Sequence, residues 1–530
     1  MDSPRPSPAA SMGPAPSPAG GAGGLPPRPG GKLPWWALPL FLFLGVLSFG
    51  LVLSAFFVAD DFWILGTLAR RGPGEVWVHG PGGFFRPLAS SSLALDLLLW
   101  GIRPWGYHLT NTLLHSANAF LLSLLALRLH EIHSGKADPG ARFFLLPGIL
   151  FLLLPNHTET VDWISCRVDL LSTFFTLAAL VLLSKAPSPL RVSLSLLSFA
   201  AALLSKENAL VLPALVFLLP GPSSLASRLK RALPFLLALG IYILLRRLAL
   251  QAWVGGYGEM KHLAAGRAVK HIPVHIFRSF LPPLPSRTLL YLLGGGAFAW
   301  AFFRARKARA RGEGKLLGLL GGCLLVSLLP TLSLGVSETD TQGERFLYLA
   351  SAFACLALAA LLRRIRKGRI LLAGALLGGS FLLLQGNHRA WRHAGRISRD
   401  LTARLLQCPP GKRVFLLNLP EKLRGAYIAP GTTPSLALEW LYPGPDRPRL
   451  FLGIHQELSS PGEAVLARRE GRTFRLRFPR GAPGRLRKKA ARLGFLRVLE
   501  FSPEGLTFQV PGLREGDLVF YFSRGKLHSL

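Results

Sequence analysis

A series of apolar runs between residues 34 and 386 constrains this chain more than any other feature. Many of them approach the ~20 residues that a helix needs to cross the hydrocarbon core of a bilayer. Half of the 530 residues are hydrophobic, yet the formal net charge is +35, a combination that a soluble globular domain rarely shows. The sequence therefore predicts an α-helical polytopic membrane protein.

About eleven segments are candidate membrane spans. They are residues 34–58, 106–127, 143–155, 168–184, 192–204, 208–220, 232–250, 286–303, 315–334, 345–362 and 369–386. Several are shorter than a perpendicular crossing requires, so we expect their helices to extend into the polar flanks or to tilt within a bundle.

Lys and Arg residues in alternate loops predict the orientation of these spans. The loops assigned to the cytoplasm each hold two to six such residues, whereas the loop at 335–344 on the opposite side holds none. Because positive residues concentrate in cytoplasmic loops, the N-terminus is predicted inside and the loop after the first span outside. An odd number of spans places the C-terminal region outside too. Positive charge of this kind does not indicate nucleic acid as a partner.

Composition divides the chain into three parts. Residues 1–33 are dominated by Pro, Gly, Ala and Ser, which cannot build a core and predict a disordered cytoplasmic tail. Residues 34–386 form the predicted transmembrane domain, with a first outer loop at 59–105, and residues 387–530 form an extracytoplasmic domain. The first apolar run is too long for a secretory signal peptide and lacks a convincing cleavage site, so we interpret it as an uncleaved span.

The C-terminal region carries 26 Lys and Arg against 11 Asp and Glu, a net charge of +15. Short β-rich runs punctuated by Pro and Gly predict a small strand-rich domain. These runs are Arg413–Leu419, Leu450–Ile454, Thr473–Phe478, Phe495–Phe501, Leu506–Val510 and Leu518–Phe522. Its basic surface fits anionic lipid, an acidic glycan or simply a solvated face. The four cysteines of the chain are scattered, so no zinc site is expected.

Two adjacent carboxylates, Asp60 and Asp61, follow directly after the first span. Carboxylates at the mouth of a membrane helix are costly unless they face water or a partner. The loop that they open contains two amphipathic helix candidates, Phe62–Arg71 and Pro87–Trp100, and such a loop can lie along the membrane surface. A carboxylate in that position can act as a base on a polar acceptor while a donor is held in lipid.

Further polar groups recur at the predicted outer ends of later spans. They occur as Phe85-Arg86-Pro87-Leu88, Gly106-Tyr107-His108 with Asn111 and His115, Asn156-His157-Thr158-Glu159, Arg167 with Asp169-Leu170-Leu171, Lys206-Glu207, and Glu344-Arg345 with Tyr348. His108, Asn111 and His115 fall on one helical face, so they point into the bundle either for binding or for interhelical hydrogen bonds. Because all these clusters lie on the predicted side of Asp60 and Asp61, the sequence predicts one polar site at the outer interface.

In order, spacing and predicted topology, this series resembles the transmembrane part of the TMTC-type protein O-mannosyltransferases. More broadly it resembles the GT-C superfamily of glycosyltransferases that use polyprenyl-phosphate-linked sugars. The resemblance implies an inverting transfer from such a donor to an acceptor hydroxyl at the outer face of the membrane. TMTC proteins continue into tetratricopeptide repeats, whereas residues 396–530 show no 34-residue helical period. The acceptor is therefore left open between protein Ser or Thr and a cell-envelope glycan.

The same resemblance implies that Asp60 is the general base that acts on the acceptor hydroxyl. Asp61 then orients the acceptor, helps to hold a divalent metal ion, or is the base itself. Two adjacent carboxylates tend to raise the pKa of one of them, so the sequence does not assign the proton. No cofactor is firmly implied.

Cations are needed to stabilise the leaving lipid phosphate. The candidates for binding the donor phosphate or the substrate are Arg86, His108, Asn111, His115, His157, Glu159, Arg167, Asp169, Lys206, Glu207, Glu344, Arg345 and Tyr348. The four cations among them would contact the phosphate, with His108 and His157 as hydrogen-bond donors. For Arg345, an ion pair with the adjacent Glu344 is the alternative role.

Two other interpretations fit the same residues. In a transporter or flippase for a lipid-linked or anionic substrate, the charges would line a translocation path, although no inverted repeat is evident. An inactive GT-C relative could instead serve as a membrane scaffold through its C-terminal domain. The composition and the uncleaved first span suit a bacterial inner membrane, with the active site and C-terminal domain outside the cytoplasm.

Overall fold

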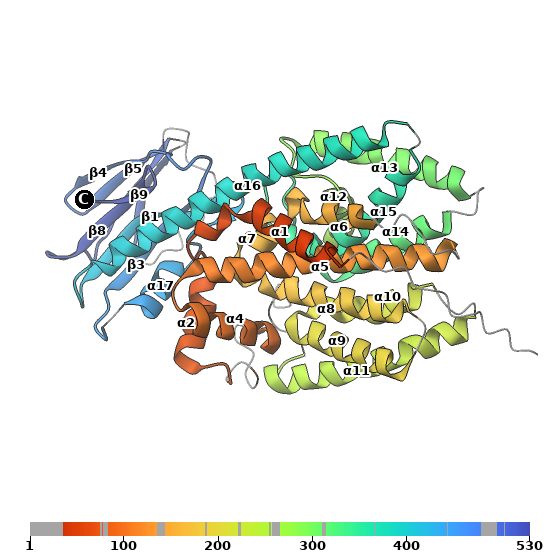
Figure 1. The fold of residues 1–530 in the computed structure, drawn as a ribbon. Coiled ribbons are helices and arrows are strands. Elements are labelled where there is room, and N and C mark those ends of the chain that lie inside the picture. The colour runs from red at the N-terminus through yellow and green to blue at the C-terminus, as the bar shows by residue number, and fades with distance from the viewer. Residues whose placement is uncertain are drawn as a thin grey trace, which may run out of the picture.

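The computed structural model describes residues 35–74, 77, 83–134, 144–185, 188–220, 224–253, 256, 265–309, 314–365, 367–442, 444–478, 495–502 and 504–530. A helical bundle comprises most of the chain, and a strand-rich domain lies at one end of it (Figure 1). The predicted tail at 1–33 lies outside the described residues.

Helices occupy each of the eleven segments predicted to cross the membrane. In chain order they are α1 (Ala37–Phe49), α5 (Pro104–Ser134), α6 (Leu145–Leu152), α8 (Arg167–Leu183), α9 (Pro189–Ser205), α10 (Leu212–Leu218), α11 (Leu225–Leu250), α13 (Arg287–Arg309), α14 (Gly314–Leu328), α15 (Tyr348–Arg363) and α16 (Arg369–Leu406). A further helix, α12 (Ala265–Arg278), precedes α13.

Six helical stretches in the described part of the chain are long and apolar enough to cross a bilayer. They are Pro104–His133, Ile164–Leu183, Leu225–Leu250, Gly314–Thr331, Glu344–Arg363 and Arg369–Leu406. Four shorter apolar helices accompany them, at Ala37–Phe49, Pro87–Trp100, Pro189–Ser205 and Glu207–Leu218. The chain is therefore an integral multi-pass membrane protein, and the count of eleven complete crossings stays a prediction.

The loop after α1 contains both helices that its sequence predicted, α2 (Asp60–Arg71) and α4 (Pro87–Trp100). α2 buries Phe62, Leu65 and Leu68 on one side, while Arg70 and Arg71 are exposed in its last turn. Positive charge at that end complements the negative end of the helix dipole. The amphipathic pattern thus fixes which side of α2 packs against the protein.

Two sheets form the C-terminal domain, as its strand-rich sequence predicted. The first is built on β1 (Arg413–Leu423), with β2 (Ala426–Tyr427), β3 (Arg449–Leu458), β8 (Leu518–Ser523) and β9 (Lys526–Ser529). The second is antiparallel and runs in the order β4 (Leu466–Glu470), β5 (Thr473–Arg477), β7 (Gly505–Gln509) and β6 (Arg497–Ser502). Six of the nine strands correspond to the predicted runs.

Strand β1 is buried almost throughout, because both of its faces are covered. Phe415 and Leu417 pack on one side with Phe474 and Phe508 of the second sheet. On the other side, Leu416 shares a cluster with residues of α16 and of the short helix α17 (Thr433–Leu441). β1 pairs in parallel with both β3 and β8, and a parallel strand covered on two faces reads as a continuous apolar run.

Helix α16 joins the two parts of the molecule. It runs without interruption from the apolar residues near Arg369 to Leu406, packs against the first sheet, and is the long helix that links bundle and sheets in Figure 1. Since α17 also packs against α2, the C-terminal domain contacts the first outer loop directly. This contact positions the carboxylates described next.

Candidate active site

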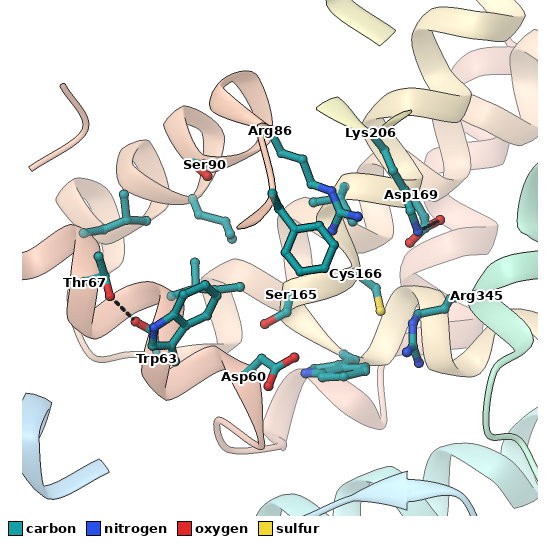
Figure 2. A pocket seen from close by; sticks show the side chains of 16 residues that line it. Asp60, Trp63, Thr67, Arg86, Ser90, Ser165, Cys166, Asp169, Lys206 and Arg345 are labelled. Atoms are coloured by element: carbon teal, nitrogen blue, oxygen red, sulfur yellow. Dashed lines mark hydrogen bonds and ion pairs between the residues drawn. The ribbon is translucent and has the colours of Figure 1, made fainter. Parts of the chain in front are cut away.

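A cavity of about 120 Å³ lies among α2, the start of α4, the start of α8 and the loop before α10 (Figure 2). It is lined by Asp60, Trp63, Ile64, Thr67, Leu68, Phe84, Arg86, Ser90, Leu93, Trp163, Ser165, Cys166, Val168, Asp169, Lys206 and Arg345. Five of the predicted site residues, Asp60, Arg86, Asp169, Lys206 and Arg345, come together here. These five residues come from positions 60 to 345, so the fold brings together distant parts of the helical bundle.

Asp60 is the carboxylate that the cavity exposes. It occupies the first turn of α2, where the positive end of the helix dipole favours a negative charge. The surrounding protein nevertheless removes much of its hydration, and this desolvation raises the pKa of Asp60, while the positive charge of Arg345 lowers it. An exposed carboxylate with a raised pKa is suited to accept a proton from a bound hydroxyl.

Asp61 points away from the cavity into the protein and is buried. Its Oδ2 accepts a hydrogen bond from the backbone N–H of Val58 at 3.0 Å, and its Oδ1 accepts from the N–H of Ser165 at 2.9 Å and from the Ser165 hydroxyl. Burial raises the pKa of Asp61 to about 7 against the lowering effect of these three bonds. Asp61 thus ties the start of α2 to the segment before α8.

Three cations face Asp60 across the cavity, and each is held by its own carboxylate. Arg86 Nε donates to Glu207 Oε2 at 2.9 Å and its second nitrogen completes a bidentate pair. Lys206 Nζ lies 2.6 Å from Asp169 Oδ1. Such pairing fixes the direction of each side chain and leaves the cavity close to neutral before an anion enters.

Arg345 differs from its predicted pairing. Its guanidinium and its backbone N–H both bond to Glu159, the latter at 2.9 Å, rather than to the adjacent Glu344. Glu344 instead pairs with Arg278, and both of those side chains are fully buried. The alternative role considered for Arg345, an ion pair with Glu344, is therefore not the pairing in the structure, because the two side chains bond to different partners from the short helical turn before α15.

A second group of predicted site residues lies outside the cavity, in the bundle. Arg167 is fully buried and donates to Asp96, to Asn111 and to the carbonyl of Tyr107. His115 bonds to the Tyr348 hydroxyl at 2.7 Å and to the carbonyl of Leu152. The contacts of Asn111 and His115 are therefore hydrogen bonds between helical segments, which was one of the two roles considered for this face of α5.

His157 and His108 are also buried and do not line the cavity. The two ring nitrogens of His157 bond to the carbonyl of Phe151 and to the Ser351 hydroxyl. His157 therefore joins three helical segments, and its ring faces the packed bundle.

Several lining residues were not singled out from the sequence. Trp63 and Thr67 lie one turn apart on α2, and Ser165 follows Trp163 just before the predicted Arg167. Asp96, which pairs with Arg167, was detectable as a lone carboxylate in the otherwise apolar helix α4. The remaining lining residues are apolar or small, and no pattern marks them in the sequence.

The C-terminal domain closes over the segment that presents Asp60. The backbone N–H of Ala59 donates to the carbonyl of Ile428 at 3.1 Å. The ring of Trp440 lies 5.2 Å from that of Phe57 and 6.2 Å from that of Phe62, centroid to centroid, and Glu439 pairs with Arg70 at 3.2 Å. Within the described residues, no group of three or more His, Cys, Asp or Glu side chains is arranged to hold a metal ion.

No protein-family model matches the chain. Parts of it are similar in sequence to protein O-mannosyltransferases. They include tmtc2 of Xenopus laevis (34% identity over 167 residues, 29% of this chain and 19% of that protein), Tmtc1 of Drosophila melanogaster (32% over 187 residues, 33% and 21%) and TMTC4 of Homo sapiens (28% over 205 residues, 33% and 28%). The chain thus spans less than a third of the length of each of these relatives.

Among solved structures, the chain is similar to ArnT from Cupriavidus metallidurans, which was crystallised with undecaprenyl phosphate and in the apo state. The superpositions cover 90% and 89% of this chain and 98% and 97% of ArnT, with TM-scores of 0.41 and 0.43 and identities of 11% and 13%. The sequence matches confirm the resemblance predicted from the motifs: over part of its length, this membrane protein is related to the TMTC O-mannosyltransferases.

Proposed function

We propose that the chain is a GT-C type glycosyltransferase that moves a sugar from a polyprenyl-phosphate-linked donor to an acceptor hydroxyl. The observation that carries the proposal is the arrangement of Figure 2, in which one exposed carboxylate, Asp60, faces Arg86, Lys206 and Arg345 across a single cavity. A reaction that needs a base at one end and charge neutralisation at the other requires this separation.

In the proposed reaction the acceptor hydroxyl approaches the anomeric carbon from the side opposite to the phosphate. As the new oxygen–carbon bond forms, the hydroxyl proton passes to the Asp60 carboxylate. The anomeric carbon–oxygen bond breaks at the same time, and its electron pair leaves with the lipid phosphate. Attack from the opposite face inverts the anomeric configuration.

The three cations stabilise the leaving phosphate. Arg86 and Arg345 present planar guanidinium groups, which can contact two phosphate oxygens at once, and Lys206 supplies a compact charge. Their carboxylate partners, Glu207, Glu159 and Asp169, hold them in place before the donor binds. Asp61 orients the catalytic segment in this mechanism, since its oxygens accept bonds from Val58 and Ser165.

The apolar part of the cavity wall supports a lipid-linked donor. Ile64, Leu68, Leu93 and Trp63, from α2 and α4, form an apolar part of the cavity lining. An isoprenoid chain could leave the site along this wall, whereas a fully water-soluble sugar nucleotide would gain nothing from it. The relatives' name adds mannose as the first sugar to test, with protein Ser or Thr and envelope glycans as acceptors.

The proposed topology keeps the cavity and the C-terminal domain outside the cytoplasm, in a bacterial inner membrane. Single cysteines introduced between residues 59 and 74 should react with a membrane-impermeant maleimide added to intact cells. Labelling only after the cytoplasmic side is opened would overturn this orientation.

The activity is tested in vesicles that contain the full chain and undecaprenyl phosphate carrying radiolabelled mannose, followed by mass spectrometry of envelope glycans with and without the gene. Asp60→Asn should insert normally and lose transfer by at least 100-fold. Full transfer by both Asp60→Asn and Asp61→Asn would exclude the carboxylate mechanism. Movement of the labelled lipid between leaflets without transfer would favour a flippase.

A further inference from the structure

A second cavity, of about 130 Å³, lies between α16 and the segment that follows α1. It is lined by Ser54, Phe56, Arg392, Arg396 and Arg399. We propose that this cavity binds the phosphate headgroup of an anionic phospholipid. The inference does not depend on the proposed glycosyl transfer.

The three arginines form one stripe on α16. With 3.6 residues per turn, Arg392, Arg396 and Arg399 fall within an arc of about 60° around the helix axis. All three side chains are exposed. They therefore present their guanidinium groups together on one side of the helix, above Ser54 and Phe56.

The position of the stripe along α16 matches the headgroup layer of a bilayer. Ile370, Leu371 and Leu382 are exposed apolar residues on the same helix, with exposed fractions of 72% or more, and belong in contact with lipid. A span of about 20 residues that begins near Ile370 ends near residue 389. Arg392 and Arg396 then lie about 4.5 and 10.5 Å beyond the hydrocarbon edge, within reach of headgroup phosphates for a long side chain.

The charge of the stripe is largely uncompensated by protein. In the part of the chain that the structure describes, Arg399 pairs with Asp400 (Nε to Oδ1, 3.3 Å), and neither Arg392 nor Arg396 is paired with a carboxylate. Three guanidinium groups around one cavity repel one another unless an anion sits among them. A phosphate offers several acceptor oxygens to this fork-shaped set of donors.

The cavity touches the segment that leads to Asp60. Gly395 packs against the backbone of Ala55 and Phe56, where a Cβ atom would lie 2.6 Å from the Phe56 nitrogen, and the Ser398 hydroxyl donates to the carbonyl of Phe57 at 2.7 Å. A headgroup held by Arg392 and Arg396 would thus rest against the same short segment. We expect binding to stabilise the fold of this region.

The test uses the full chain in detergent micelles, titrated with vesicles of phosphatidylglycerol or of phosphatidylcholine, with bound lipid counted by native mass spectrometry and thermal stability followed in parallel. Phosphatidylglycerol should bind and raise the unfolding temperature, whereas phosphatidylcholine should not. Each of Arg392→Gln and Arg396→Gln should weaken binding about five-fold, as expected for one basic residue at a membrane surface.

Arg404→Gln is the matched control, because Arg404 is exposed on the same helix, lies about 80° around the axis from Arg396 and does not line the cavity. Binding unchanged in the triple variant of Arg392, Arg396 and Arg399 would overturn the proposal. So would equal protection by millimolar inorganic phosphate, because the site would then take a free anion. The single variants keep the test decisive if the triple variant fails to fold.

Discussion

The backbone N–H of Ala59 donates to the carbonyl oxygen of Ile428 at 3.1 Å, which links the residue before Asp60 to the C-terminal domain. Ala59 adopts φ 48° and ψ −122°, a conformation that glycine accepts and that other residues avoid. This backbone turn sends Asp60 into the cavity and Asp61 into the protein. The C-terminal domain therefore holds a strained turn directly beside the proposed base.

Replacing Ala59 tests that strain. A non-glycine residue in this region costs roughly 1–3 kcal/mol, and the extra freedom of glycine in the unfolded chain costs about 0.5–1 kcal/mol. Ala59→Gly should therefore raise the free energy of unfolding by about 1 kcal/mol and keep transfer, measured by SDS-induced unfolding and the vesicle assay. Ala59→Val should lower both, since a β-branched side chain fits poorly at positive φ. Equal stability of the two variants would contradict the strain.

Trp440 tests whether the C-terminal domain positions the catalytic segment. Its ring packs on Phe57 and Phe62, and Gly66 lies against its Cβ atom. Trp440→Ala should reduce kcat of transfer by 10-fold or more, because small displacements of a reacting group are costly. Trp440→Phe retains an aromatic ring there and should keep most of the activity. The same loss in both variants would point to general unfolding, which limited proteolysis would reveal.

The helical architecture could be predicted from the sequence because hydrophobic length is a direct physical requirement of the bilayer. The helix α2 was predicted from an amphipathic pattern that repeats over several turns. A helix was also predicted at α4, but its predicted amphipathic character is wrong, because α4 exposes Leu95, Leu98 and Leu99 and buries Asp96. The strands β2 and β9 were missed because two and four residues carry too little pattern, and β4 was missed because three of its five residues are charged. Their pairing depends on partners distant in the sequence.

In the candidate site, the charged residues could be predicted but their pairing could not. Charged residues in a membrane chain stand out, so Asp60, Arg86, Lys206 and Arg345 were found. Their pairing could not be predicted: Arg345 bonds to Glu159, a partner 186 residues away, rather than to its neighbour. Local sequence also could not separate the cavity from the buried network around Arg167, since both contain polar residues at the same predicted depth.

Asp61 should matter for stability more than for chemistry. Asp61→Ala leaves the N–H groups of Val58 and Ser165 without their acceptor inside the protein, and each unsatisfied buried donor costs about 1–3 kcal/mol. We expect a clear fall in the unfolding midpoint. Ser165→Ala removes one bond to Asp61 and should give a smaller fall. If Asp61→Ala kept wild-type stability yet lost transfer, Asp61 would be the better candidate for the base.

The pH dependence of transfer should reflect the environment of Asp60. A general base works in its deprotonated form, so kcat/KM should rise with pH through the pKa of Asp60. Desolvation raises that pKa above the usual value of about 3.9. The acid limb of the profile, where kcat/KM rises with pH, therefore lies at higher pH than for an ordinary aspartate. Because the charge of Arg345 lowers the Asp60 pKa, Arg345→Gln should move the limb to still higher pH.

Arg86→Gln is the control for this profile. Arg86 also lines the cavity, but Arg345 is the cation whose charge lowers the Asp60 pKa. Arg86→Gln should raise KM for the lipid-linked donor and leave the acid limb in place. A limb that moves equally in both variants would mean that the titrating group senses the whole cationic set, and one that moves in neither would assign the titration to a group other than Asp60.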